Sequence, residues 1–275
     1  MLKWLTFSLF AYVGVVFAVH IDWRAVAIGA VVPKFALNGD TITLIVAIFG
    51  TTISPYLFFW QSSQEVEEEE ADPDAGPLLE HPEQAGRELT RIEWETWVGM
   101  AMSNLVAFFI ILTTAVTLNA NGQTDIQTSA QAAAALRPIA GDWAFALFSL
   151  GIIGTGLLAV PVLAGSAGYA VGEASGWRIG LERAPAEARG FYAVIGIAIL
   201  LGVGVDLTGL DPIKALIWSA VLNGVITVPV MAATMIVASR PERMGEFVAT
   251  RGQRIGGWLT TAMMAAASLA MFILM

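Results

Sequence analysis

The stretch Ala47–Trp60, which reads AIFGTTISPYLFFW, interrupts an otherwise apolar segment with a glycine, two threonines, a serine and a proline. Pro55 has no amide proton and its ring clashes with the preceding helical turn, while Gly50 adds backbone freedom nearby. Non-helical backbone persists at membrane depth only where protein covers it or where it lines a polar cavity. In secondary transporters such a broken helix commonly binds the substrate. The alternative is an ordinary proline kink, which membrane helices also tolerate.

The composition of the chain is that of an integral membrane protein. Of its 275 residues, 56% are hydrophobic and 13% are charged, and the mean hydropathy is +0.70. A helix needs about 20 mostly apolar residues to cross a bilayer. We therefore expect an all-α protein, with residues 1–275 in a single transmembrane domain. The seven predicted transmembrane helices are Trp4–Val19, Thr41–Gln61, Trp97–Leu118, Trp143–Val171, Phe191–Val205, Ile213–Ala238 and Ile255–Met275.

The basic residues are distributed unevenly between the predicted loops. If the amino terminus lies in the cytoplasm and seven helices alternate, ten of the 14 Lys and Arg residues fall on the cytoplasmic side and four outside. This agrees with the positive-inside rule and predicts a multi-pass protein of the plasma or inner membrane, with the lipid bilayer as a partner. The net charge is −9, but most of the acidic residues lie in one loop, so this charge says little about nucleic acid; no nucleic-acid partner is expected. The absence of cysteine excludes disulfides and thiolate metal sites.

The main soluble segment is Gln64–Glu93, which begins with the acidic run Glu65–Glu70. Such runs are typical of solvated, partly disordered chain, and we predict a cytoplasmic loop here. A weak cation-attracting entrance is the functional alternative. Thr90–Glu95 is expected to form a short surface helix that leads into the next transmembrane segment.

Few polar side chains lie within the apolar segments, and each is therefore a candidate functional group. Besides the hydroxyls of the interrupted stretch, the candidates are Asn104, Asn223 and Glu173. A hydrogen bond between helices is the alternative role for each, with Glu173 near the cytoplasmic interface. No P-loop, His-Glu-x-x-His motif or serine-nucleophile elbow is present, so the sequence does not predict an enzyme.

The stretch Gly50–Tyr56 resembles the Nramp family of proton-coupled divalent metal transporters, in which the sixth helix is broken at Met-Pro-His. Gly151–Pro161 resembles the eighth helix of that family, and Ala220–Ile226 resembles the tenth. Ser62–Glu67 resembles a bacterial branch distant from the characterised manganese and iron transporters. The resemblance covers the whole chain and implies a partial LeuT-like fold. That fold would contain the second inverted repeat with flanking helices, one of them discontinuous, equivalent to helices five to eleven of the family.

The resemblance also implies a set of site residues. Ser54 stands where the family has its metal-binding methionine, Tyr56 at the histidine implicated in proton movement, and Thr51 where a backbone carbonyl binds the ion. Hydroxyl and carbonyl ligands suit Mg²⁺, Mn²⁺ or Ca²⁺ better than softer metals, and tyrosine is a poor proton carrier at neutral pH. The implied metal ligands are Thr51 and Ser54, and the implied substrate pathway includes Gly50, Pro55, Tyr56, Asn104 and Asn223.

The chain lacks one element of the family pattern. The first helix of the family is broken at Asp-Pro-Gly, whose aspartate is the main charged ligand, and this chain has no such motif and no four helices before Trp4. We therefore expect a carboxyl-terminal portion of an Nramp-like transporter, with a separate amino-terminal half as a candidate partner. The expected function is divalent metal transport by alternating access, with Mn²⁺, Fe²⁺ or Mg²⁺ as the cargo and no permanently bound cofactor. Two alternatives are an amino-acid transporter of the same architecture and a non-transporting subunit or fragment.

Overall fold

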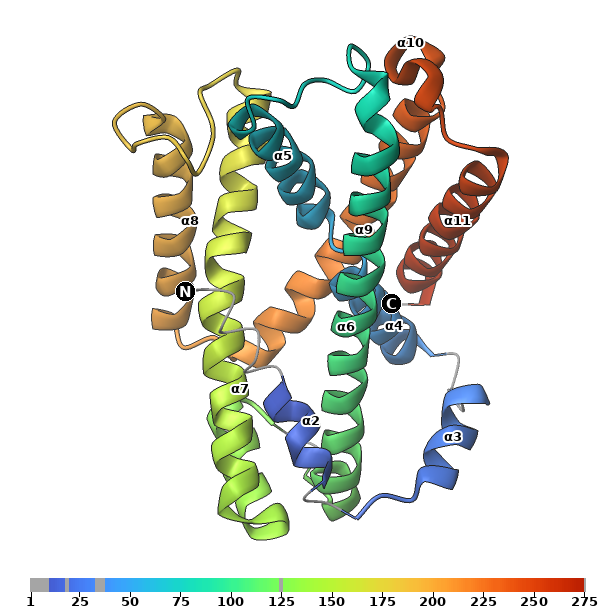
Figure 1. Cartoon of the computed structure of the whole chain (residues 1–275). Helices are drawn as coiled ribbons and strands as arrows, with labels where there is room; N and C mark the ends of the chain where they lie inside the picture. Colours follow the sequence, from blue (N-terminus) through green and yellow to red (C-terminus); the bar gives the residue numbers. More distant parts are fainter. Residues whose placement is uncertain (1–9, 18–19, 33–37, 124–125, 275) are drawn as a thin grey trace. The chain divides into compact units, whose positions relative to one another are not determined.

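A computed structural model describes residues 10–17, 20–32, 38–123 and 126–274, and these form helices and no strands (Figure 1). The all-α prediction is therefore confirmed. The longer helices are α2 (Phe10–Phe17), α3 (Trp23–Val31), α4 (Gly39–Thr52), α5 (Pro55–Ala71), α6 (Ala85–Thr117), α7 (Ser129–Ala174), α8 (Arg189–Leu207), α9 (Pro212–Ala238) and α11 (Arg251–Leu274). The short helical turns are η2 (Pro82–Gln84), η3 (Asn119–Asn121), α10 (Pro241–Met244) and η4 (Gly245–Phe247).

Five helical stretches of the described residues are long and apolar enough to cross a membrane. They are Gly39–Ala71, Pro82–Thr117, Gly141–Ala174, Pro212–Ala238 and Arg251–Leu274, which correspond to five of the predicted transmembrane helices. The apolar helix Arg189–Val205 is shorter, and half of the predicted helix Trp4–Val19 lies outside the described residues. The structure thus supports a multi-pass membrane protein, while the number of seven stays a prediction.

The described residues form two compact units. The first unit is drawn from residues 1–34, 90–168 and 192–214, so it holds α2, α3 and most of α6, α7 and α8. Its largest apolar cluster joins α6 and α7 and consists of Val106, Leu118, Ala132 and Phe148. Within α7, Gly141 has a φ of 81°, a conformation that glycine adopts readily, and it interrupts the helix before the long apolar stretch begins.

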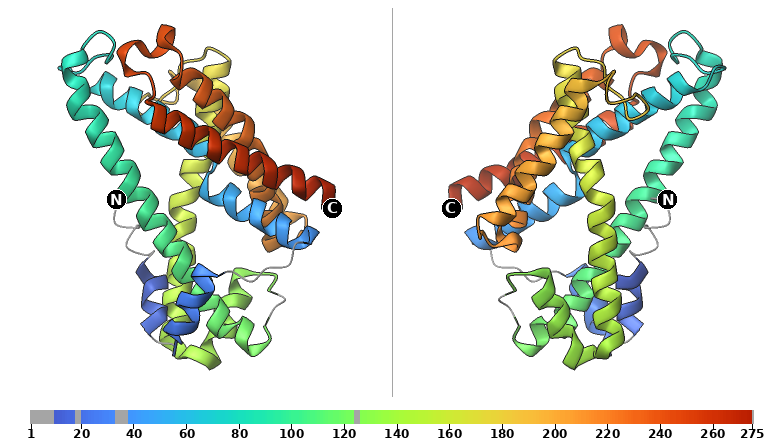
Figure 2. Two further views of the ribbon diagram at one scale, coloured as in Figure 1. Left: turned by 90° about the vertical axis from the view of Figure 1, so that its right-hand side faces the viewer. Right: turned by 90° about the vertical axis from the view of Figure 1, so that its left-hand side faces the viewer.

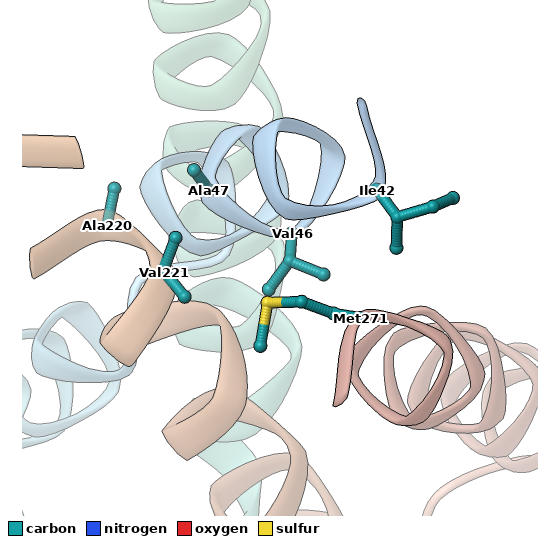
Figure 3. Close-up of a cluster of buried hydrophobic side chains, with 6 residues drawn as sticks. All are labelled: Ile42, Val46, Ala47, Ala220, Val221 and Met271. Atoms are coloured by element: carbon teal, nitrogen blue, oxygen red, sulfur yellow. The ribbon is translucent and has the colours of Figure 1, made fainter. Parts of the chain in front are cut away.

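The second unit is drawn from residues 35–89, 169–191 and 215–275 and contains α4, α5, most of α9, and α11 (Figure 2). Its core is a cluster of buried side chains in which Val46 of α4 and Val221 of α9 lie around the sulfur of Met271 from α11 (Figure 3). Helices α4 and α9 also touch through their backbones. A Cβ added at Gly50 would collide with the Ala220 carbonyl oxygen, and one added at Gly224 would meet the Val46 carbonyl oxygen.

The acidic segment differs from its prediction. Helix α5 continues through the run Glu65–Glu70 to Ala71, and α6 already begins at Ala85, so the prediction of a partly disordered loop is wrong for both ends of Gln64–Glu93. Thr90–Glu95 is an internal part of α6 and not a separate surface helix. The physical reason lies in Glu67, whose carboxylate accepts hydrogen bonds from Tyr169 and from the backbone amide of Leu181. These contacts anchor the acidic end of α5 to the protein.

Candidate functional site

The predicted interruption of the second apolar segment is present and is two residues long. Helix α4 ends at Thr52 and α5 begins at Pro55, so Ile53 and Ser54 connect two separate helices. Ser54 is extended, with φ −78° and ψ 125°. Pro55 occupies the first position of α5, where its missing amide proton would have had no helical partner in any case. The segment is therefore a broken helix and not a single helix with a proline kink.

The Ser54 side chain satisfies the open end of α4. The last four carbonyls of any α-helix have no partner within the helix, and the Ser54 hydroxyl lies 3.0 Å from the Gly50 oxygen and 2.9 Å from the Thr51 oxygen. Ser54 is only 1% exposed and does not cap α5. A hydroxyl carries one proton and two lone pairs. The Ser54 hydroxyl therefore shares its single hydrogen between these two carbonyls, and its lone pairs can still bind a ligand.

The threonines of the break contact their own helix. The Thr51 and Thr52 hydroxyls both donate to the Ile48 oxygen, at 2.8 and 2.9 Å. Thr51 is exposed whereas Ser54 is buried. The two predicted metal ligands are three residues apart in the chain but differ in burial. They are linked by a hydrogen bond from the Ser54 hydroxyl to the Thr51 carbonyl oxygen.

Helix α9 contributes a residue that sequence reasoning missed. Thr227 is fully buried, and its hydroxyl lies 2.7 Å from the Ile53 oxygen in the break and 2.7 Å from the Asn223 oxygen of its own helix. Asn223, a predicted pathway residue, is half-buried one turn earlier on α9. Within the part of the chain that the structure describes, its carboxamide makes no hydrogen bond. The spacing of four residues from Asn223 was the available signal, since it places Thr227 on the same helix face.

Two further predicted pathway residues lie on α5 and α6. Tyr56 is half-buried in the first turn of α5. Asn104 is exposed on α6, in the first unit, where its amide donates to the Met100 oxygen at 2.8 Å. That bond lies within one helix, so it is not the hydrogen bond between helices that was the alternative role, and a pathway role for Asn104 stays a prediction.

A polar network holds the other end of α5. The Tyr169 hydroxyl donates to Glu67 at 2.6 Å, the Gln64 amide donates to the Tyr169 oxygen at 3.1 Å, and the Ser63 hydroxyl donates to Glu173 at 2.8 Å. The Tyr169 ring also packs edge-on against Trp60, with ring centroids 5.8 Å apart. Glu173 thus binds a neighbouring helix, as its alternative role predicted.

The break offers neutral oxygen atoms and no carboxylate. No group of three or more His, Asp or Glu side chains among the described residues could hold a metal ion. The available donors are hydroxyls and backbone carbonyls, which are hard oxygen ligands that suit Mg²⁺ or Mn²⁺. Neutral ligands leave the charge of a desolvated divalent cation uncompensated.

A chain whose described residues are helical, with five stretches long and apolar enough to cross a membrane and one of these broken at a buried hydroxyl, is a multi-pass membrane protein. Residues 1–274 match the family model described as natural resistance-associated macrophage protein-like, and the chain belongs to this family, Nramp. The resemblance seen in the sequence is thereby confirmed.

Two curated relatives carry the name divalent metal cation transporter MntH. One is from Klebsiella pneumoniae strain 342 and is 25% identical over 267 residues, and the other is from Klebsiella pneumoniae subsp. pneumoniae strain ATCC 700721 / MGH 78578 and is 26% identical over 267 residues. Each alignment covers 93% of this chain and 57% of the relative. The chain therefore spans a little over half the length of these relatives.

Proposed function

We propose that this chain takes part in moving divalent metal ions across a plasma or inner membrane by alternating access, as a transporter and not as an enzyme. The observation that carries the proposal is the buried Ser54 hydroxyl at a two-residue break within an apolar helix. Membership of the Nramp family and the names of the two relatives support the same conclusion.

The proposed ion site is formed by Thr51 and Ser54 together with the carbonyl of Gly50. In the structure the Ser54 hydroxyl lies within hydrogen-bond distance of the Gly50 and Thr51 oxygens. A cation at this point would take over both carbonyls, and the Ser54 hydroxyl would turn its lone pairs toward the ion. Asn223 would approach from α9, because its neighbour Gly224 touches Gly50 of α4 and Thr227, one turn further on, contacts the Ile53 oxygen in the break. Pro55 and Tyr56 continue the pathway along α5.

The ligand set favours hard cations. Mg²⁺ and Mn²⁺ are the preferred cargo, and Fe²⁺ is the third candidate. Because all of these donors are neutral, we propose that a carboxylate from a separate amino-terminal half completes the site and compensates the charge of the ion.

The test is metal flux through the purified chain in proteoliposomes, alone and together with an amino-terminal half taken from a relative. Ser54→Leu replaces the hydroxyl with a bulky apolar group and is expected to abolish Mn²⁺ uptake. Ser62→Leu is the matched control, because Ser62 also bonds carbonyls of its own helix, at 2.8 and 3.2 Å, but lies exposed on α5. Unchanged flux in the Ser54 variant would exclude this site. Uptake of amino acids instead of metals would favour the alternative substrate class.

A further inference from the structure

The contact between Thr227 and the break assigns a role to a residue outside the proposed ligand set. We infer that Thr227 is a positioning residue for the ion site, which fixes the orientation of Ser54 through the carbonyl of Ile53. The inference rests on the proposed function, since it concerns the same ion site. It extends that proposal by adding a residue of α9 that controls the site without touching the ion.

The geometry connects a buried side chain to a backbone group at the point where the helix is broken. The Thr227 hydroxyl is fully buried and lies 2.7 Å from the Ile53 oxygen, although the two residues are 174 positions apart in the chain. Ile53 lies between the two helices, and its φ of −110° and ψ of 67° are not helical. A partly buried carbonyl at such a position, outside the hydrogen-bond pattern of a helix, gains a partner from another element, and Thr227 supplies it.

The Ile53 carbonyl and the Ser54 amide belong to one planar peptide unit. Fixing the oxygen of this unit therefore fixes the direction in which the chain enters Ser54. From that direction the Ser54 hydroxyl reaches the Gly50 and Thr51 oxygens. Thr227 thus positions Ser54 through a single rigid peptide bond.

The Thr227 hydroxyl also has a second acceptor. The Asn223 oxygen lies at 2.7 Å as well, and one hydroxyl proton cannot form a full hydrogen bond with both carbonyls at once. When the Ile53 peptide turns, the proton can remain bonded to Asn223, so the buried hydroxyl is never left unsatisfied. Because of this second acceptor, the hydrogen bond between α9 and the break can open and form again with little loss of free energy.

The test is the dissociation constant of Mn²⁺ measured by calorimetry on the purified chain, with the same amino-terminal half present if the wild type requires it. Thr227→Val removes the hydroxyl at nearly constant shape and should weaken binding about tenfold, as expected for one buried hydrogen bond. Thr227→Ser should restore binding, and Thr227→Cys, a weaker donor, should lie between. Thr234→Val is the control, because Thr234 donates only to its own helix, at 3.0 Å to the Val230 oxygen, and lies exposed.

A double-mutant cycle separates positioning from a general structural role. If Thr227 acts through Ser54, adding Thr227→Val to Ser54→Ala should change the dissociation constant less than twofold. A tenfold effect that persists in the Ser54→Ala background would overturn the inference, as would wild-type affinity in Thr227→Val. Failure of the wild type to bind Mn²⁺ is a different result, which would remove the proposed ion site and this inference together. The melting temperatures of all variants identify any variant that fails to fold. If Thr227→Val does not fold, the Mn²⁺ affinities of Thr227→Ser and Thr227→Cys test the inference instead.

Discussion

The two halves of the broken helix are held by different kinds of contact. Helix α4 is fixed by close packing: Val46 is completely buried against Met271, and Gly50 lies in backbone contact with Ala220 and Gly224 of α9. Helix α5 is fixed at its far end by side-chain hydrogen bonds, chiefly from Tyr169 to Glu67 and from Ser63 to Glu173.

This difference has a physical consequence. Backbone contact between small residues has no alternative partner, so separating α4 from α9 loses all of its packing energy at once. Hydrogen bonds between side chains near the end of a membrane helix can be exchanged for bonds with water. The comparison therefore predicts that α4 is bound firmly to α9 and α11, whereas changing one polar group loosens the far end of α5.

The largest effect is expected at the packed half. In Gly50→Ala the new methyl group would collide with backbone atoms of Ala220 and Gly224, which cannot move aside as a flexible side chain can. Overpacking of this kind costs about 3 kcal/mol or more, so we expect poor yield and a large fall in melting temperature. Gly256→Ala on α11 is the control, since a Cβ there meets nothing within 4 Å. Equal stability of the two variants would contradict the tight contact.

A smaller effect is expected at the polar half. Tyr169→Phe removes the donor to Glu67 and the acceptor of the Gln64 amide while it keeps the ring that packs on Trp60. A hydrogen bond to a charged group contributes about 1.5–3 kcal/mol. We therefore expect a moderate loss of thermal stability, together with faster amide hydrogen exchange in residues 60–71 and unchanged exchange in α4. Uniform acceleration across both helices would show that they are not held independently.

Local residue types made the break predictable from the sequence. Pro55 and Gly50 act on their own neighbours, and the hydroxyls between them indicated a polar site within an apolar segment. In the structure α5 begins at Pro55, because proline starts a helix more readily than it continues one. The ligand roles of Thr51 and Ser54 still rest on the family resemblance.

The contacts that hold the segment were not predictable, because their partners are distant in the sequence. Glu67 lies in an acidic run that reads as disordered chain, and its donor Tyr169 is 102 residues away. Thr227 bonds a backbone oxygen, so the side chain of Ile53 gives no sign of the contact, and the four-residue spacing from Asn223 indicates only that Thr227 shares its helix face. An alignment in which Thr227 varies together with residues of the break would be the kind of signal able to find it.

The smallest effect is expected in a comparison of two glutamates on the same helix. Glu67→Gln and Glu70→Gln make the same chemical change three residues apart, but Glu67 contacts Tyr169 at 2.6 Å, whereas Glu70 forms an ion pair with Arg183 at 3.8 Å in which both side chains are exposed. Exposed ion pairs contribute about 0–1 kcal/mol, so Glu70→Gln should shift the melting temperature little, and less still at high salt. Glu67→Gln should reproduce most of the Tyr169→Phe effect, since both weaken one bond. If the Glu70 variant proves the less stable of the two, the anchor of α5 is the ionic contact to Arg183 and not the hydrogen bond to Tyr169.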